Sequence, residues 1–263
     1  MADEPILELH DIYKSFGPVD VLKGVDIVVR PGQVTALVGD NGAGKSTLVK
    51  CISGTYPIDS GVYLFEGKPV SVHSPRDASA LGIEIVYQDL ALCDNLDVVQ
   101  NMFLGRERLS GAVLDESSME QSANETLKSL SVRTVSSVRQ RVASLSGGQR
   151  QTVAIAKAVL WNSKVVILDE PTAALGVAQT AQVLSLVRRL ADRGLGVVLI
   201  SHNMNEVLQV ADEIAVLYLG QMAAQVKRKD VNQQQLVELI TTGGLGGADV
   251  PGDGTTTRTG ASA

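Results

Sequence analysis

The segment that most constrains the fold is GDNGAGKST at residues 39–47, which fits the P-loop pattern G-x-x-x-x-G-K-[ST]. The apolar, largely β-branched residues 34–38 before it predict a buried strand. Residues 46–53 after it predict a helix that ends at Gly54. A strand, a glycine-rich loop and a helix, in this order, form the context in which the motif binds phosphate.

The chemistry of this loop follows from its residue types. Glycines allow several backbone N–H groups to point at one anion, and the helix N-terminus adds its positive dipole end. Lys45 supplies a positive charge for the β- and γ-phosphates of a nucleotide, and the Ser46 hydroxyl can ligate Mg²⁺. The competing interpretation is a glycine-rich turn with a chance lysine, which the flanking strand and helix disfavour.

A second apolar run, residues 164–170, predicts a buried strand that ends in Asp169 and Glu170. Carboxylates beside a phosphate site are explained by a metal ion. Asp169 can bind Mg²⁺, and Glu170 can orient or deprotonate the attacking water. The alternative is an ordinary cluster of helix-capping residues that includes Thr172.

Two more predicted strands, residues 83–87 and 196–200, deliver polar residues at their ends, Gln88 and His202. Ligands of α/β proteins collect at the carboxyl edge of a parallel sheet, so both are candidate site residues. Taken alone, Gln88 is only a polar strand end, and a lone histidine is usually structural or exposed.

The motif LSGGQ at residues 145–149 precedes a predicted helix over 151–160. Ser146 can cap this helix, and Gly147 and Gly148 leave its first N–H groups open to close approach. This is a second potential anion site. Two such sites in one chain make sense if the second serves a nucleotide held by another subunit.

The N-terminal residues 6–13 and 21–29 have strand character and predict an antiparallel layer against the parallel core. Phe16, in the turn between them, is equally well explained as a core residue or as a ring that stacks on a purine. Residues 115–130 carry apolar side chains at helical spacing, behind a possible cap at Asp115.

The domain organisation predicted from these patterns is one domain over residues 1–242, with a helical subdomain at about 90–160. Residues 243–263 are rich in Gly, Thr, Ala and Asp and predict a disordered tail. The net charge of −6 argues against a nucleic-acid partner. Neither a signal peptide nor an apolar run of about 20 residues is present, which favours a cytoplasmic protein whose membrane association needs a partner.

Together the motifs resemble the ATP-binding subunits of ABC transporters over roughly residues 6–241. The most specific mark is LSGGQ, similar to the ABC signature, between a P-loop and the segment KVVILDEPT at residues 164–172. The resemblance implies an α/β fold: a P-loop (RecA-like) ABC ATPase core with a parallel sheet, an antiparallel β subdomain and an inserted helical subdomain.

The resemblance also implies roles for individual residues, with ATP and Mg²⁺ as ligands. Phe16 stacks on adenine, Gln88 is the Q-loop glutamine, Asp169 the Walker B aspartate, Glu170 the catalytic glutamate and His202 the switch histidine. The nucleotide-binding residues implied are Phe16, Gly39, Asn41, Gly42, Ala43, Gly44, Lys45, Ser46, Thr47, Ser146, Gly147 and Gly148. Those implied for the metal are Ser46, Gln88 and Asp169, and those for catalysis are Glu170, His202 and Gln88.

The implied partners are a second ATPase subunit in a head-to-tail dimer, transmembrane permease subunits and, indirectly, a sugar-binding protein. Such a subunit lies on the inner face of the cell membrane. Residues 85–92, 101–107 and 170–176 resemble bacterial importers of ribose, xylose or fructose more closely. One position departs from the family pattern: Gly176 stands where an aspartate usually helps to couple the two sites.

Two other functions compete with a transport ATPase. One is a soluble, non-transport ABC ATPase, such as those that serve iron–sulfur cluster assembly. The other is a module that holds ATP without hydrolysing it; the pair Asp169 and Glu170 argues against this, and Gly176 weakly favours it.

Overall fold

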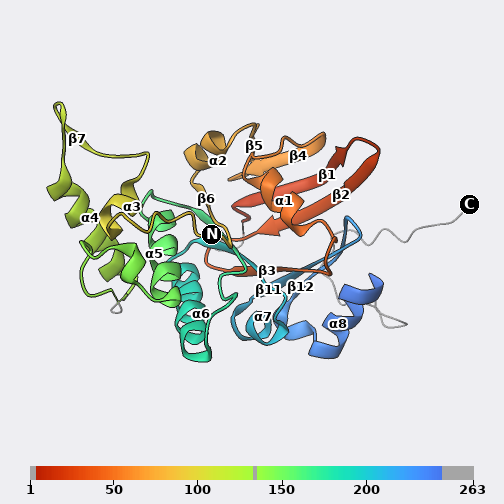
Figure 1. Cartoon of the computed structure of the whole chain (residues 1–263). Helices are drawn as coiled ribbons and strands as arrows, with labels where there is room; N and C mark the ends of the chain where they lie inside the picture. The colour runs from red at the N-terminus through yellow and green to blue at the C-terminus, as the bar shows by residue number, and fades with distance from the viewer. Residues whose placement is uncertain (1–3, 133–134, 245–263) are drawn as a thin grey trace, which may run out of the picture.

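Two main β-sheets and eight α-helices form the chain in the computed structural model, which describes residues 4–132 and 135–244 (Figure 1). The antiparallel four-stranded sheet has the order β2-β1-β4-β5. Its strands are β1 (Leu7–Phe16), β2 (Val19–Val29), β4 (Ser60–Phe65) and β5 (Lys68–Pro69).

The six-stranded sheet has the order β12-β11-β3-β10-β9-β6, and all of its strands are parallel except β12. Its strands are β3 (Val34–Val38), β6 (Ile83–Val86), β9 (Val165–Asp169), β10 (Gly196–Ile200), β11 (Glu213–Tyr218) and β12 (Gln221–Lys227). A small hairpin joins β7 (Leu109–Ser110) to β8 (Val113–Leu114).

The helices are α1 (Lys45–Ile52), α2 (Pro75–Leu81), α3 (Val98–Phe103), α4 (Glu116–Ser129), α5 (Gly147–Val159), α6 (Val177–Asp192), α7 (Met204–Val210) and α8 (Gln233–Thr242). Two short 3₁₀ helices cover Val142–Ser144 and Arg228–Asp230. In Figure 1 the four-stranded sheet and α1 lie above the six-stranded sheet, and α6, α7 and α8 lie below it. Helices α3, α4 and α5 form one end of the molecule, here called the helical lobe.

Alternation along the parallel strands builds the core on both faces of the six-stranded sheet. Val165 and Ile167 of β9 pack with α1 and the four-stranded sheet, whereas Val166 and Leu168 pack with α5 and α6. All four side chains are fully buried. A sheet covered on both faces explains why its strands read as continuous apolar runs in the sequence.

The register of the parallel strands brings the predicted site residues to one edge. Leu37 of β3 pairs with Ile200 of β10, Ile200 pairs with Asp169 of β9, and Leu168 pairs with Val86 of β6. The chain therefore leaves four neighbouring strands at the same level, which confirms the predicted parallel sheet and explains how motifs far apart in the sequence meet.

The helices differ in whether a side chain caps their N-terminus. Six of the eight helices in residues 4–132 and 135–244 begin at a Ser, Asp or Asn whose side chain accepts a backbone N–H, as Ser146 does for α5. Helices α1 and α6 begin instead at Gly44 and Gly176, with no side-chain cap. Since the first N–H groups of a helix lack intrahelical partners, these two starts keep their donors for other acceptors.

Most helices and strands lie where the sequence predicts them, and a few differ. Helix α5 begins at Gly147, four residues before the predicted start, because the capping box at Ser146 and Gln149 already begins the helix. Helices α3 and α7 and the hairpin β7–β8 were not predicted; α3 and α7 have only 6 and 7 residues, too few to show a clear period. Residues 245–263 of the predicted tail lie outside the described residues.

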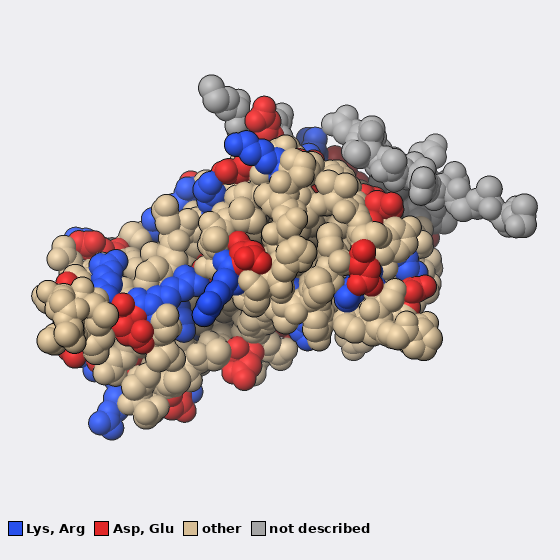
Figure 2. All heavy atoms as spheres, turned by 90° about the horizontal axis from the view of Figure 1, so that it is seen from above, with Lys and Arg blue, Asp and Glu red and all other residues tan. Residues whose placement is uncertain are grey.

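Charged side chains of both signs lie on the upper face of the molecule, among a larger uncharged surface. In Figure 2 the Lys and Arg side chains gather over the end that carries the helical lobe, and Asp and Glu side chains lie among them. Ion pairs connect elements across the chain: Arg106 to Glu84 at 3.0 Å, and Lys164 to Glu66 at 2.6 Å. No helix within residues 4–132 and 135–244 is both long and apolar enough to cross a bilayer.

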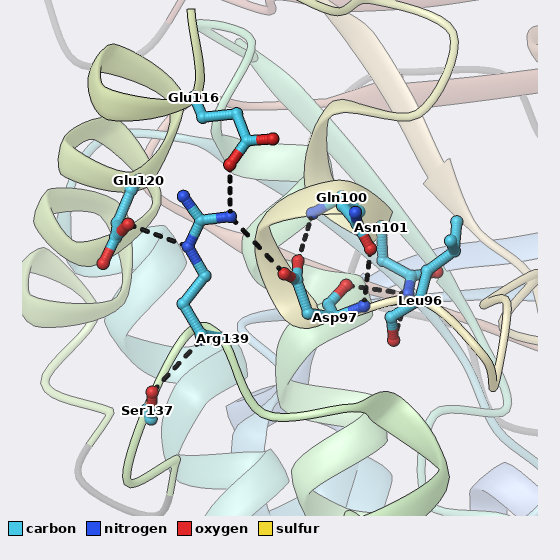
Figure 3. Close-up of polar contacts among 8 residues, drawn as sticks. All are labelled: Leu96, Asp97, Gln100, Asn101, Glu116, Glu120, Ser137 and Arg139. Carbon is cyan, nitrogen blue, oxygen red and sulfur yellow. Dashed lines mark hydrogen bonds and ion pairs between the residues drawn. The ribbon is translucent and has the colours of Figure 1, made fainter. Parts of the chain in front are cut away.

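Inside the helical lobe, Arg139 connects two helices (Figure 3). Its Nε donates to Glu120 at 2.8 Å and its Nη1 to Glu116 at 3.0 Å, both on α4. Nη1 also lies 3.6 Å from Asp97, which caps α3. One guanidinium thus reduces the repulsion among three carboxylates and connects α3 to α4.

We expect Arg139→Ala to lower the free energy of unfolding by about 1 kcal/mol at low salt, and by less at high salt, because the pairs are partly exposed. Urea unfolding at low and high ionic strength measures both effects. Arg141→Ala is the matched control, since that side chain is exposed and lies two residues away. Equal losses in the two variants would contradict this role of Arg139.

Candidate functional site

The P-loop folds as its sequence predicts, between β3 and α1. Gly39 has φ 155°, and a Cβ there would clash with the backbone oxygen of Leu217. Gly44 has φ 105° and is the N-cap of α1. Glycine is required at both positions, because L side chains rarely adopt such backbone angles. The first N–H groups of α1 therefore face the loop.

Lys45 holds its ammonium group across this loop. Its Nζ donates to the backbone oxygens of Gly39 at 2.7 Å and Asp40 at 2.9 Å. Burial lowers the pKa of Lys45, and the charges of Glu170, Asp40 and Asp169 oppose that shift. The lysine is thus a partly desolvated cation with several anionic neighbours, which strengthens its attraction for phosphate oxygens.

Asp169 and Glu170 lie where β9 ends, at the same edge as the P-loop. Burial raises the pKa of Asp169 and the charge of Glu170 raises it further, whereas Lys45 and Lys50 lower it. A half-buried carboxylate whose charge is opposed by a second carboxylate gains stability from a cation.

Glu170 contacts the histidine that follows the neighbouring strand. Its Oε1 lies 3.0 Å from Nδ1 of His202, whose side chain is 72% exposed. Glu170 has φ 47°, a region that non-glycine residues occupy at a cost. Its N–H donates to the backbone oxygen of Ile200 at 3.0 Å. The structure therefore brings together the predicted pair Glu170 and His202.

Gln88 and Phe16 are both exposed. Gln88 follows β6, which pairs with β9, and its side chain is exposed. Phe16 ends β1 and is 42% exposed; its ring packs edge-on against Tyr56 at 5.1 Å, and Lys14 lies 5.4 Å from the ring centre. An exposed ring fixed by Tyr56 is available for stacking and is not a core residue.

The LSGGQ segment forms a capped helix start with contacts of its own. Ser146 accepts from the N–H of Gln149 at 3.4 Å, and the Ser146 N–H donates to Oε1 of Gln149 at 2.8 Å. A Cβ on Gly147 would lie 3.2 Å from Leu175, and one on Gly148 would lie 3.1 Å from Gln179. In Figure 1, α5 lies in the helical lobe, apart from α1. The chain does not gather these residues with its own P-loop.

Two further residues, which the sequence did not indicate, support the site. Tyr56 fixes Phe16, and Glu206 of α7 accepts from Thr172, close to Glu170. Thr172 and Asn203 were visible as polar residues beside the motifs, but a contact between segments so far apart in the sequence has no local pattern.

The position that departs from the family pattern has room for a side chain. Gly176 is the N-cap of α6, with φ −73° and ψ 161°, and a Cβ there would meet nothing within 4 Å. These angles suit a capping aspartate. The glycine is therefore not imposed by this fold.

We expect the Gly176→Asp variant to be more stable than Gly176→Ala by about 1 kcal/mol, because only the aspartate can accept an N–H of α6. The alanine variant is the matched control, since both changes restrict the unfolded chain alike. Urea unfolding measures the difference. Equal free energies of unfolding would show that no cap forms at this position.

Known proteins share this arrangement. The family model described as ABC transporter matches residues 22–173. The xylose/arabinose import ATP-binding protein of Sulfolobus acidocaldarius is 45% identical over 241 residues, covering 92% of this chain and 96% of that protein. The fructose import ATP-binding protein of Rhizobium meliloti is 46% identical over 248 residues, covering 92% and 95%. The ADP conformation of an ATP-binding cassette of an ABC transporter has a TM-score of 0.78 and 26% identity, covering 91% and 96%.

The family model spans more than half of the chain, and the chain matches both relatives over nearly their whole length. The P-loop of this chain and its structural likeness to an ATP-binding cassette agree on a P-loop ATPase. The chain belongs to the ABC transporter family and is an ATP-binding subunit of the ATPase type.

Proposed function

We propose that the chain hydrolyses ATP to energise a separate membrane permease that imports a monosaccharide. The observation that carries the proposal is the 45–46% identity to xylose/arabinose and fructose import ATP-binding proteins over almost the full length. The chain supplies the ATPase part of such a system. Alternating access would belong to the permease, with ATP binding and hydrolysis driving it between its two states.

ATP is proposed to bind along the P-loop, with its phosphates against residues 39–47 and its base on Phe16. The left-handed glycines, the open start of α1 and the charge of Lys45 support phosphate binding. The exposed ring of Phe16 supports base stacking. The phosphate-binding residues are Gly39, Asn41, Gly42, Ala43, Gly44, Lys45, Ser46 and Thr47.

Mg²⁺ is proposed to bind near the carboxyl edge of the parallel sheet, through side-chain oxygens. Ser46 is exposed in the first turn of α1. Asp169 is a half-buried carboxylate next to Glu170 in the chain, and Gln88 follows β6, which pairs with β9. We propose that these three residues hold the ion. When bound, Mg²⁺ would neutralise charge on the β- and γ-phosphates.

Glu170 is proposed as the base that accepts a proton from the attacking water, and His202 as a contact of the γ-phosphate. The 3.0 Å contact between them supports a shared position at the γ-phosphate end of the site. Lys45 and the N–H groups of α1 would stabilise the negative charge that spreads over the transferring phosphoryl group. Gln88, which is exposed and follows β6, completes the proposed catalytic set.

A second copy or a related subunit is proposed to supply Ser146, Gly147 and Gly148 to the nucleotide. Helix α5 presents an exposed capped N-terminus apart from its own P-loop, which suits a head-to-tail dimer. Binding to the permease would hold the chain on the inner, cytoplasmic face of the membrane. A sugar-binding protein would be an indirect partner, through the permease. We propose one ATPase domain over residues 1–242, with a helical subdomain at about 90–160, followed by a tail at 243–263.

The proposal is tested by isolating partners from detergent-solubilised membranes of the source organism. Tagged Glu170→Gln chain with ATP is the bait, and Lys45→Ala chain with ATP is the matched control. Mass spectrometry is expected to find a polytopic permease, accompanied by a sugar-binding protein, with the first bait. Recovery of soluble partners alone would contradict import and favour a non-transport ABC ATPase of the iron–sulfur assembly type.

A further inference from the structure

We propose that Glu206 is a positioning residue that fixes the loop carrying Glu170 against the loop carrying His202. The inference rests on the proposed roles of those two residues. Glu206 lies in the first turn of α7 and is 9% exposed. It acts through neighbours that flank both functional side chains.

The carboxylate of Glu206 accepts from three side chains on two loops. Its Oε2 accepts from Oγ1 of Thr172 at 2.5 Å and from Oγ of Ser201 at 3.3 Å, and its Oε1 accepts from Nδ2 of Asn203 at 3.0 Å. Ser201 and Asn203 stand on either side of His202, and Thr172 stands two residues after Glu170. One buried carboxylate therefore joins both loops.

The partners of this carboxylate also hydrogen-bond to one another and to the start of α7. The Asn203 N–H donates to Oγ of Ser201 at 3.1 Å, and Oδ1 of Asn203 accepts from the Asn205 N–H at 3.1 Å. Thr172 and Ser201 are themselves buried, at 8% and 3% exposure. These two hydroxyls hold a single arrangement, because breaking the bond of either one to Glu206 deprives a buried group of a partner that water cannot easily replace.

A fixed loop is needed because the backbone of Glu170 is strained. Its φ of 47° is costly for a non-glycine residue and persists only where surrounding contacts impose it. The Glu170 N–H is held by the backbone oxygen of Ile200, and the Thr172 hydroxyl is held by Glu206. Without the second contact, the loop could relax and move the Glu170 carboxylate away from His202.

The competing role for Glu206 is local. It lies in the first turn of α7, where an acidic side chain is favoured by the helix dipole. That role needs only a negative charge at this position and no contact with Thr172. An aspartate retains the charge but is one methylene shorter, so Glu206→Asp separates the two roles.

The test measures steady-state ATPase activity and ATP affinity, the latter with a fluorescent ATP analogue, on the full chain. We expect Glu206→Asp and Thr172→Val each to lower kcat about tenfold, while the Kd for the analogue stays within about twofold. Thr172→Ser, which keeps the hydroxyl, is the matched control and is expected to retain kcat within about twofold. The double variant Glu206→Asp/Thr172→Val is expected to be no slower than the slower single variant, because each single change already removes the bond between Glu206 and Thr172.

Full kcat in Glu206→Asp, or additive losses in the double variant, would overturn the inference. A parallel fall in kcat and ATP affinity would overturn it as well, because a general structural defect acts on both. If Glu206→Asp fails to fold, Thr172→Val against Thr172→Ser decides the question. Wild-type activity in Glu170→Gln would instead refute the assignment of the base, which distinguishes failure of the proposed function from failure of this inference.

Discussion

Replacing Glu170 by glutamine is expected to lower kcat by about 10²- to 10⁴-fold while ATP affinity is retained. The amide is nearly isosteric with the carboxylate and can still contact Nδ1 of His202, now 3.0 Å from Glu170 Oε1. It cannot accept a proton from water. The P-loop and Lys45 are unchanged, so the phosphate contacts remain. Phosphate release and binding of a fluorescent ATP analogue measure the two effects separately.

The same variant is expected to accumulate as an ATP-bound dimer, because closure needs ATP and reopening needs hydrolysis. Size-exclusion chromatography with and without ATP reads this out. Glu125→Gln is the matched control: Glu125 is an exposed carboxylate on α4 that accepts from Gln121 at 2.8 Å, and its variant should turn over normally. Rapid turnover by Glu170→Gln would remove Glu170 from the role of base.

The carboxyl edge of the parallel sheet could be predicted because its signals are local. Residues 34–38, 165–169 and 196–200 are apolar runs of strand length, each followed directly by polar residues. Parallel pairing then places those polar residues together without further information, as the pairs Leu37 with Ile200 and Ile200 with Asp169 confirm. The roles of Phe16 and Ser146 depended on family resemblance, since composition and spacing left each with a structural alternative.

The support of the site could not be predicted in the same way. Thr172 and Glu206 are 34 residues apart, and nothing in either segment marks the other as its partner. The φ of 47° at Glu170 is likewise imposed by the surrounding contacts and not by its residue type. Helix α7, which presents Glu206, has only 7 residues, so its period is hidden. Motifs reveal the groups that perform chemistry, whereas their alignment depends on long-range packing.

Replacing Lys45 by alanine is expected to weaken ATP binding by about 100-fold, or about 3 kcal/mol. The ammonium group of Lys45 is partly buried near Asp169, Glu170 and Asp40, and burial lowers its pKa. Its bonds to two backbone oxygens hold it at the P-loop. Its loss removes charge-assisted bonds to phosphate oxygens and leaves the carboxylates to repel the nucleotide. Titration with a fluorescent ATP analogue at fixed salt measures the change.

Lys45→Ala also removes the two bonds to the backbone oxygens of Gly39 and Asp40, so the loop itself has to be checked. Urea unfolding of the variant without nucleotide reports that contribution, which is expected to be small because water can replace a partly exposed donor. Lys128→Ala, an exposed lysine on α4, controls for the loss of one positive charge. If Lys45→Ala bound ATP as tightly as Lys128→Ala, the phosphates could not lie against this loop, and Mg²⁺ coordination by Ser46 and Asp169 would lose its basis too. The loss of affinity in Lys45→Ala therefore tests the placement of the whole nucleotide and not one contact.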